Sequence, residues 1–293
     1  MGSKRSSEGL QWLVFLGPAV VFFFIIIVIP FVMSLYYSFT EWNGVTSNVK
    51  WVGFDNFKRI LADDQDFHRS FWFTTRFTIA KVLLANLVGF GLALLLSQAL
   101  KSRNVLRTVF FMPNVIGGLL LGFIWQFIFV KGFATLGELT DLAFFKLPWL
   151  GDAPTAFWGL VIVSVWQTAG YLMVIYIAAL ANVPKELLEA AYIDGATRWE
   201  TLRKITIPMI MPAVTVCLFL AISWAFKMYD LNVSLTKGGP FNSTESVALN
   251  IYEEAFRNNR YGLGTAKAVI FFIVVALITM VQVTLTKRKE VEV

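Results

Sequence analysis

Residues 82–100 read VLLANLVGFGLALLLSQAL and contain no Asp, Glu, Lys or Arg. An α-helix rises about 1.5 Å per residue, so about 20 apolar residues cross the roughly 30 Å of hydrocarbon in a bilayer. This run is therefore long enough for one crossing. Unpaired backbone amides cannot face lipid, and the run lacks the alternation of polar and apolar residues that a barrel strand requires. The stretch predicts a transmembrane helix.

Five more charge-free windows of similar or greater length occur in the chain. They span residues 9–40, 108–130, 153–184, 205–226 and 268–286. The alternative, buried helices in a large soluble core, fits so many long windows in one short chain poorly. The first window is much longer than the roughly 7–15 apolar residues of a secretory signal and has no clear small-residue cleavage site. We therefore expect it to be an uncleaved first helix.

The composition agrees with a membrane protein. The 293 residues are 57% hydrophobic and 15% charged, whereas about a quarter of the residues of soluble domains are charged. One Cys excludes an internal disulfide framework, and one His excludes a multi-histidine metal site. The net charge of +6 bears on membrane orientation rather than on nucleic acid, for which we expect no binding.

These patterns predict an all-α, polytopic integral membrane protein with six transmembrane helices. The expected helices lie at about 11–39, 74–100, 105–130, 154–182, 206–229 and 265–286. Tails at 1–10 and 287–293 flank the membrane domain, 11–286.

The distribution of Lys and Arg predicts that both termini are cytoplasmic. With the amino terminus inside, the inner segments carry twelve basic residues in 44 positions, and the outer segments carry nine in 90. The higher density inside is what the positive-inside rule requires. The short loop 101–107 has three bases and no acid, which makes it the strongest local indication.

The loop between the fourth and fifth windows, at 184–206, is long, polar and patterned. Pro184 suits a helix start, and Gly195 suits a helix end because glycine alone takes the left-handed conformation without steric cost. Thr197 and Glu200 form the pattern of a capping box for a second short helix. The acids of the first helix would be disfavoured at anionic headgroups, so docking to a protein is the better explanation.

Residues 189–196 read EAAYIDGA and are followed by Ile205-Thr-Ile-Pro208. This pattern resembles the E-A-A loop of the membrane subunits of bacterial ABC importers. The stretches SLYYSF at 34–39, VGFDNF at 52–57 and LTKGGP at 235–240 resemble the carbohydrate-uptake branch, and within it the maltose-type first permeases. The resemblance extends over nearly the whole chain.

The resemblance implies the transmembrane domain of a type I ABC importer in the cytoplasmic (inner) membrane of a bacterium. Its partners would be a second homologous permease of different sequence, two copies of the ABC ATPase, and a solute-binding protein that meets the outer loops. The loop would be a coupling helix that inserts into a cleft of the ATPase. The residues that this implies for the coupling contact are Glu189, Ala190, Ala191, Asp194 and Gly195.

ATP hydrolysis cannot come from this chain, because no glycine is followed by the Lys that a phosphate-binding P-loop needs. We therefore expect no enzyme activity and no cofactor in this chain, with ATP and Mg²⁺ bound by the partner ATPase. An intramembrane enzyme would need a nucleophile and a base, and Cys217 has no candidate base near it in sequence.

Polar and aromatic residues inside the windows predict a substrate pathway. Ionisable groups in the membrane cost at least ~2.5 kcal/mol on insertion scales, and aromatic faces stack on sugar rings. The resembling family places its translocation site on the fourth and fifth helices. The candidates are Trp166, Gln167, Tyr171, Trp224, Lys227 and Met228.

There are alternatives for two of these residues. Trp224 could serve only in packing, and Lys227 could lie at the membrane interface or pair with Asp230. If Lys227 faces the pathway, an acidic sugar becomes a candidate substrate. Another polar solute, such as a glycerol phosphate, is the second reading of function. A channel or an ion-coupled carrier is a distant third, because neither has a use for an E-A-A loop.

Overall fold

A computed structural model describes residues 14–98 and 100–290. The expected tail 1–10, the start of the first helix and the last three residues of the carboxyl-terminal tail lie outside the described residues. The described chain is mainly helical, with one pair of two-residue strands, and divides into two compact units. Within the described residues, five helices are long and apolar enough to span a membrane, and a bent helix pair makes a sixth span if it crosses as one.

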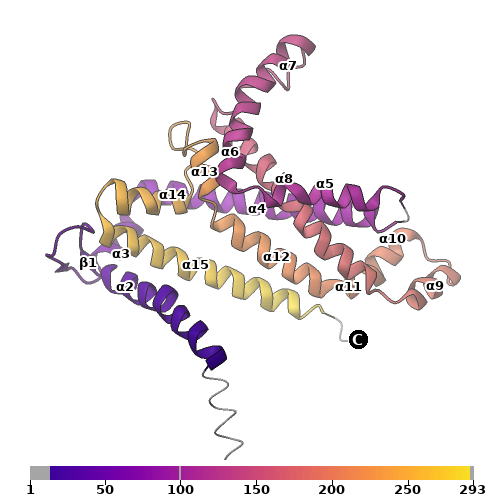
Figure 1. The fold of residues 1–293 in the computed structure, drawn as a ribbon, viewed down its shortest axis with the longest axis horizontal. Helices are drawn as coiled ribbons and strands as arrows, with labels where there is room; N and C mark the ends of the chain where they lie inside the picture. The colour runs from indigo at the N-terminus through magenta and orange to yellow at the C-terminus, as the bar shows by residue number, and fades with distance from the viewer. Residues whose placement is uncertain (1–13, 99, 291–293) are drawn as a thin grey trace, which may run out of the picture. The chain divides into compact units, whose positions relative to one another are not determined.

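The first unit contains residues 14–64 and Ile251–Phe272. Its first span runs over Val14–Tyr37 and includes the π-helical turn η1, Phe24–Val28, and α2, Ile29–Tyr37 (Figure 1). Strands β1, Thr40–Glu41, and β2, Lys50–Trp51, pair antiparallel and lead to α3, Asp55–Ala62. The turn η4, Glu253–Arg257, and the first part of α15, Tyr261–Lys287, complete this unit.

A buried ion network joins three segments of the first unit. The Lys267 ammonium on α15 lies 2.9 Å from a carboxylate oxygen of Asp64 and 2.9 Å from one of Glu254. Arg260 adds a 3.3 Å contact to Glu254. Lys267 has no exposed surface, so its charge is stabilised by these carboxylates rather than by water.

The second unit contains residues Gln65–Asn250 and the part of α15 from Ile273 onward. Its main helices are α4, Gln65–Leu96, α8, Ala153–Ala181, and α12, Met211–Phe226, which pack against one another (Figure 1). The other elements are α5, Arg103–Val115, α6, Gly118–Phe127, η2, Ile128–Gly132, α7, Phe133–Thr140, α9, Lys185–Ile193, α10, Arg198–Thr201, η3, Leu202–Thr206, α11, Ile207–Met209, α13, Asp230–Leu235, and α14, Val247–Tyr252.

Small residues allow the helices of the second unit to approach closely. A Cβ atom on Gly89 of α4 would lie 2.9 Å from the carbonyl oxygen of Ala169 on α8. A Cβ atom on Gly170 would overlap the backbone carbonyl of Phe110 on α5. Glycine at these contacts is typical of membrane helices, which associate through close backbone packing.

The structure differs from the expected third helix at 105–130. That range falls on α5 and α6, which are separated at Ile116 and Gly117, and the span that follows the break runs over Gly118–Thr140. The break has a local cause, because Pro113 lacks an N–H group and two successive glycines favour helix weakly. Ile116 is extended, with φ −77° and ψ 125°.

Two further helix ends differ from their expected positions. The second helix begins at Gln65 rather than at 74, because charged side chains do not stop a helix outside the hydrocarbon. The helical segments 198–209 and 211–226, which together form the bent pair, meet at an angle of 72°. The helix α12 therefore begins at Met211 rather than at 206, and Pro208 and Pro212, which lack an N–H group, lie on the two sides of the bend.

Candidate functional site

The loop between α8 and α12 consists of the two short helices that the sequence predicts, and we call residues 184–206 the coupling loop. Pro184 is the N-cap of α9, and α9 ends at Ile193. A capping box starts α10, because the Thr197 hydroxyl accepts from the backbone N–H of Glu200 while the Glu200 carboxylate accepts from the backbone N–H of Thr197. The predicted helix start at Pro184 and the predicted capping box of Thr197 and Glu200 are both confirmed.

Gly195 closes the first helix of the coupling loop. Its φ is +74°, and a Cβ atom there would meet nothing within 4 Å. The N–H of Ala196 donates to the carbonyl of Ala191 at 2.9 Å, and the N–H of Gly195 donates to the carbonyl of Tyr192 at 3.1 Å. These two bonds are the Schellman pattern of a helix end, so glycine is required here for its backbone conformation and not for space.

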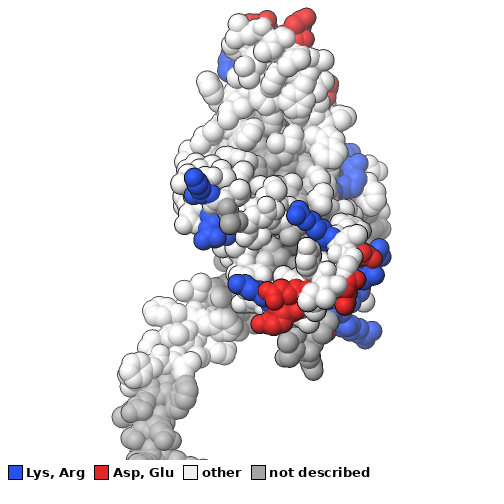
Figure 2. Space-filling model, turned by 90° about the vertical axis from the view of Figure 1, so that its right-hand side faces the viewer, with Lys and Arg blue, Asp and Glu red and all other residues white. Residues whose placement is uncertain are grey.

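The coupling loop exposes apolar side chains at its outer end. Tyr192 and Ile193 are each 83% exposed, and with Leu188 and Glu189 they line a hollow of about 500 Å³. Figure 2 faces the end of the structure that carries α9 and α10, and it shows acidic and basic side chains gathered there. Exposed apolar groups ringed by charges are typical of a protein-docking surface.

The five coupling candidates occupy different positions in this loop. Ala191 is buried on the inner face of α9, whereas Glu189, Ala190, Asp194 and Gly195 are exposed. The exposed four are therefore available for contact with a partner, whereas the buried Ala191 side chain is not.

The side chain of Glu200 stabilises the start of α10, the second helix of the coupling loop. The backbone N–H of Thr197 donates to its carboxylate at 3.0 Å and the Thr197 hydroxyl donates at 2.9 Å. Lys204 adds a contact at 3.4 Å. These hydrogen bonds favour the ionised form and lower the pKa of Glu200.

A cavity of about 240 Å³ lies among the helices of the second unit. It is bordered by α4, α8, the break between α5 and α6, and the segment after α12. Four of the six predicted pathway residues line it, namely Gln167, Trp224, Lys227 and Met228. Five polar residues that the sequence reasoning did not assign to the pathway line it as well, namely Lys81, Asn114, Ser164, Thr168 and Asp230.

The other two pathway candidates do not line this cavity. Trp166 is exposed on α8 and its ring lies edge-on to Trp125, with 5.5 Å between centroids. Tyr171 lies between Phe111 and Trp224, at centroid distances of 6.2 and 5.2 Å. Tyr171 thus contacts the edge of a ring that lines the cavity, whereas Trp166 contacts Trp125 instead.

Gln167 has a structural partner. Its side-chain nitrogen donates to the carbonyl oxygen of Ile116 at 3.0 Å, which is one of the backbone groups freed by the break between α5 and α6. In hydrocarbon such a freed carbonyl needs a donor from the protein. Gln167 also lines the cavity.

Lys81 is the pathway candidate that sequence reasoning missed. It directly precedes the charge-free window 82–100, and although it falls within the expected helix 74–100, only polar residues of the fourth and fifth helices were considered for the pathway. In the structure it lies in the middle of the 32-residue helix α4. The signal available in the sequence was helical continuity, since no Gly or Pro separates it from the apolar run before Gly89. Lys227 and Asp230, by contrast, follow the end of α12 and are exposed, and among the described residues no ion pair joins them.

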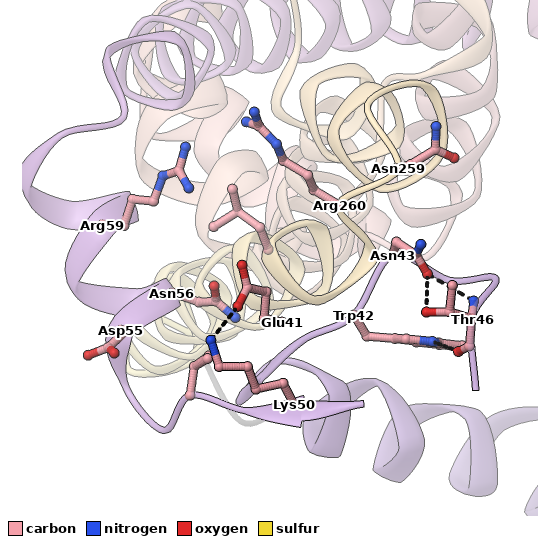
Figure 3. A pocket seen from close by; sticks show the side chains of 12 residues that line it. Glu41, Trp42, Asn43, Thr46, Lys50, Asp55, Asn56, Arg59, Asn259 and Arg260 are labelled. Carbon is pink, nitrogen blue, oxygen red and sulfur yellow. Dashed lines mark hydrogen bonds and ion pairs between the residues drawn. The ribbon is translucent and has the colours of Figure 1, made fainter. Parts of the chain in front are cut away.

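The first unit has a hollow of its own, of about 550 Å³ (Figure 3). The ion pair between Lys50 and Glu41, at 3.1 Å, links the two short strands along it. The Asn43 side chain accepts from the backbone N–H groups of Val45 and Thr46, which shapes the loop at its edge. The polar groups of this hollow are mostly engaged in holding the loop 41–59.

A family model described as "Binding-protein-dependent transport system inner membrane component" matches residues 85–291. The chain is 45% identical to the probable starch degradation products transport system permease protein AmyD of Thermoanaerobacterium thermosulfurigenes, over 99% of this chain and 98% of that one. It is 33% identical to the multiple sugar-binding transport system permease protein MsmF of Streptococcus mutans, over 93% and 92%.

Among solved structures, a chain of a bacterial alginate ABC transporter, crystallised with a periplasmic protein bound to an alginate pentasaccharide, has the same fold. The TM-score is 0.82 at 20% identity, over 97% of this chain and 96% of that one.

Proposed function

Because the chain belongs to the family of binding-protein-dependent transport system inner membrane components, we propose that it is the membrane-spanning permease subunit of an ABC importer for a carbohydrate. It lies in the cytoplasmic membrane and does not itself hydrolyse ATP. A solute-binding protein delivers the sugar from outside, and separate ATPase subunits, which bind ATP and Mg²⁺, supply the energy.

The substrate class rests on the relatives and on the cavity of the second unit. The curated relatives are named for starch degradation products and for multiple sugars. The cavity offers an indole ring at Trp224 and hydroxyl groups at Ser164 and Thr168. Aromatic rings stack on sugar faces while amides and hydroxyls pair with sugar hydroxyls, so this lining suits a sugar.

The single observation that carries the ATP-driven mechanism is the exposed apolar end of the coupling loop. Tyr192 and Ile193 are almost fully exposed although both are large and hydrophobic, and Glu189 lies beside them. Burial of these side chains in a cleft of the ATPase would remove apolar area from water, and Glu189 would form charge-assisted hydrogen bonds with a partner Arg.

Transport then follows as a shift between two states. This permease and a second, different one enclose the pathway, and closure of two ATPase subunits on ATP moves the coupling loop as a rigid body. The pathway opens outward toward the binding protein and returns inward after hydrolysis. The nucleotide changes this equilibrium only through its differential affinity for the two states.

Charge reversal at Glu189 tests the docking role. In the assembled importer, Glu189→Lys would place a cation against the partner's cation and lower ATP-dependent sugar uptake about tenfold or more. Membrane insertion and abundance should not change, because Glu189 is exposed. Uptake of radiolabelled sugar and cross-linking from Ile193→Cys to the ATPase are measured on the same membranes.

The matched control is Glu186→Lys, an exposed acid on the same helix that does not line the hollow. It should leave uptake within about twofold of the unmodified protein, since exposed charges contribute little. Normal uptake by the Glu189→Lys variant would contradict the docking role. ATP-independent import by this chain alone would refute the proposed function as a whole.

A further inference from the structure

Lys81 is a buried lysine on a membrane-spanning helix. Its side chain is 5% exposed, and it lies on the buried face of α4 with Thr74, Thr78 and Ala85, which follow the helical repeat. The surface that it retains borders the cavity of the second unit. An ionisable group at this depth is costly, so it is retained where it has a role.

Across the described residues, no hydrogen bond or ion pair of the protein satisfies the Lys81 ammonium. Asp230 lines the same cavity, but the described residues contain no ion pair between Asp230 and Lys81. Lys267 provides the internal comparison, because it is equally buried on a spanning helix and holds two carboxylates at 2.9 Å each. Of these two buried lysines, Lys267 is neutralised by carboxylates, whereas Lys81 has no partner among the described residues.

The groups around Lys81 suit an oxygen-rich ligand. Ser164 and Thr168 lie one turn apart on α8, both buried, and both line the cavity. Asn114 and the Trp224 ring border the same space. A cavity with hydroxyls, an amide, an aromatic ring and an unpaired ammonium can accept a molecule that presents several acceptor oxygens and one apolar face.

We propose that Lys81 contacts the transported sugar and holds it in the cavity by donating hydrogen bonds from Nζ to sugar oxygen atoms. This inference rests on the proposed function. The acceptor oxygens belong either to the hydroxyls of a neutral sugar or to the carboxylate of a uronic acid residue, and both present the same chemistry to the ammonium. Lys81 is therefore a specificity-determining residue of the pathway.

The test uses the complete importer in proteoliposomes with three variants. Lys81→Met keeps the length and removes every donor, Lys81→Gln keeps donors without charge, and Lys131→Met removes an exposed lysine of the same unit as the control. Uptake is measured for neutral α-glucan and for uronate oligosaccharides of equal length. ATPase activity is measured with the loaded binding protein and with the empty one.

Lys81→Met should lower uptake about ten- to a hundredfold, the change that corresponds to the loss of a hydrogen bond from a charged group. ATPase activity with the empty binding protein should not change, because α9 and α10 are untouched. If the acceptor is a hydroxyl, Lys81→Gln should restore neutral-sugar uptake in part. If the acceptor is a carboxylate, Lys81→Gln should be as impaired as Lys81→Met on uronates. The Lys131→Met control should transport normally.

Two outcomes would overturn the proposal. One is unchanged uptake of the transported sugar by Lys81→Met. The other is a parallel loss of uptake and of both ATPase activities, which would indicate a structural role. Failure of the unmodified importer to take up any saccharide would instead refute the proposed function, so the two failures are distinguishable.

A labelling experiment provides a second measurement that does not depend on transport. Lys81→Cys is made in a Cys217→Ser background, in which the native buried thiol is absent. A small water-soluble maleimide should modify residue 81 of the assembled importer, and the transported sugar should slow that modification. Equal labelling with and without the sugar, under conditions in which the sugar stimulates ATP hydrolysis, would contradict a contact at this position.

Discussion

At Gly195 the backbone has φ +74°, and the two hydrogen bonds of a helix end close α9 around it. For most residues with a Cβ atom, the left-handed conformation costs about 1–2 kcal/mol of free energy, and for asparagine the cost is smaller. Since a Cβ atom would meet nothing within 4 Å, the effect of a substitution here comes from the backbone and not from overlap.

We therefore expect Gly195→Ala to lower the ratio of sugar imported to ATP hydrolysed several-fold, because part of the population would lose the fixed angle between α9 and α10. Gly195→Asn should stay close to the unmodified protein, since Asn adopts this conformation readily. Both ratios are measured in proteoliposomes that contain the complete importer. Equal defects in the Ala and Asn variants would show that the side chain, and not the backbone, matters at this position.

Residues of the coupling loop could be predicted from the sequence because their roles are local. A capping box needs only Thr197 and Glu200 three residues apart, and a helix end needs only Gly195 at the right distance from Pro184. Lys81 could not be assigned in the same way. Its burial depends on α8 and α12, which are far away in sequence, and the charge itself ended the window from which the span was predicted.

In the first unit, Lys267 on α15 forms ion pairs with Glu254 in the turn η4 and with Asp64, which follows α3. Its ammonium holds Asp64 and Glu254, each at 2.9 Å, without access to water. Removal of one member of a buried ion pair leaves uncompensated charge, which typically costs about 3–5 kcal/mol.

Lys267→Met should accordingly destabilise the protein by about 3–5 kcal/mol and lower its abundance in the membrane. The thermal unfolding of the detergent-solubilised protein measures this, with Lys58→Met as the control. Lys58 makes an exposed pair with Asp55 at 3.8 Å, and such pairs contribute about 0–1 kcal/mol. Similar melting temperatures for the two variants would mean that the buried network contributes no more than a surface pair.

The spans show which features of an element a sequence can predict. Absence of charge marks the part of a helix that lies in hydrocarbon, and so it located the membrane crossings. It could not locate the break at Ile116 and Gly117, because an interrupted helix is as uncharged as a continuous one. Pro113 and the two glycines were the available signal, and Gln167 stabilises the break from a helix about fifty residues away.

For the whole molecule, orientation in the membrane depends on the number of crossings. If the bent pair formed by residues 198–209 and 211–226 crosses as one span, the chain has six crossings and both termini lie on the same side. If the pair instead turns back, the chain has five crossings and the termini lie on opposite sides. The density of Lys and Arg favours six, with both termini in the cytoplasm.

Single cysteines in a Cys217→Ser background decide between the two arrangements. Val45→Cys, in the exposed loop between β1 and β2, should react with an impermeant maleimide in intact cells. Asp194→Cys in the coupling loop and Lys289→Cys after α15 should react only after the membrane is permeabilised. In the proposed mechanism the coupling loop meets an ATPase that uses cytoplasmic ATP, so labelling of residue 194 from outside would contradict both the orientation and the ATP-driven mechanism. Labelling of residue 289 from outside, with residue 194 protected, would instead mean that the bent pair does not cross. In that case α15 would be the one span between residues 194 and 289, and the two residues would lie on opposite sides of the membrane.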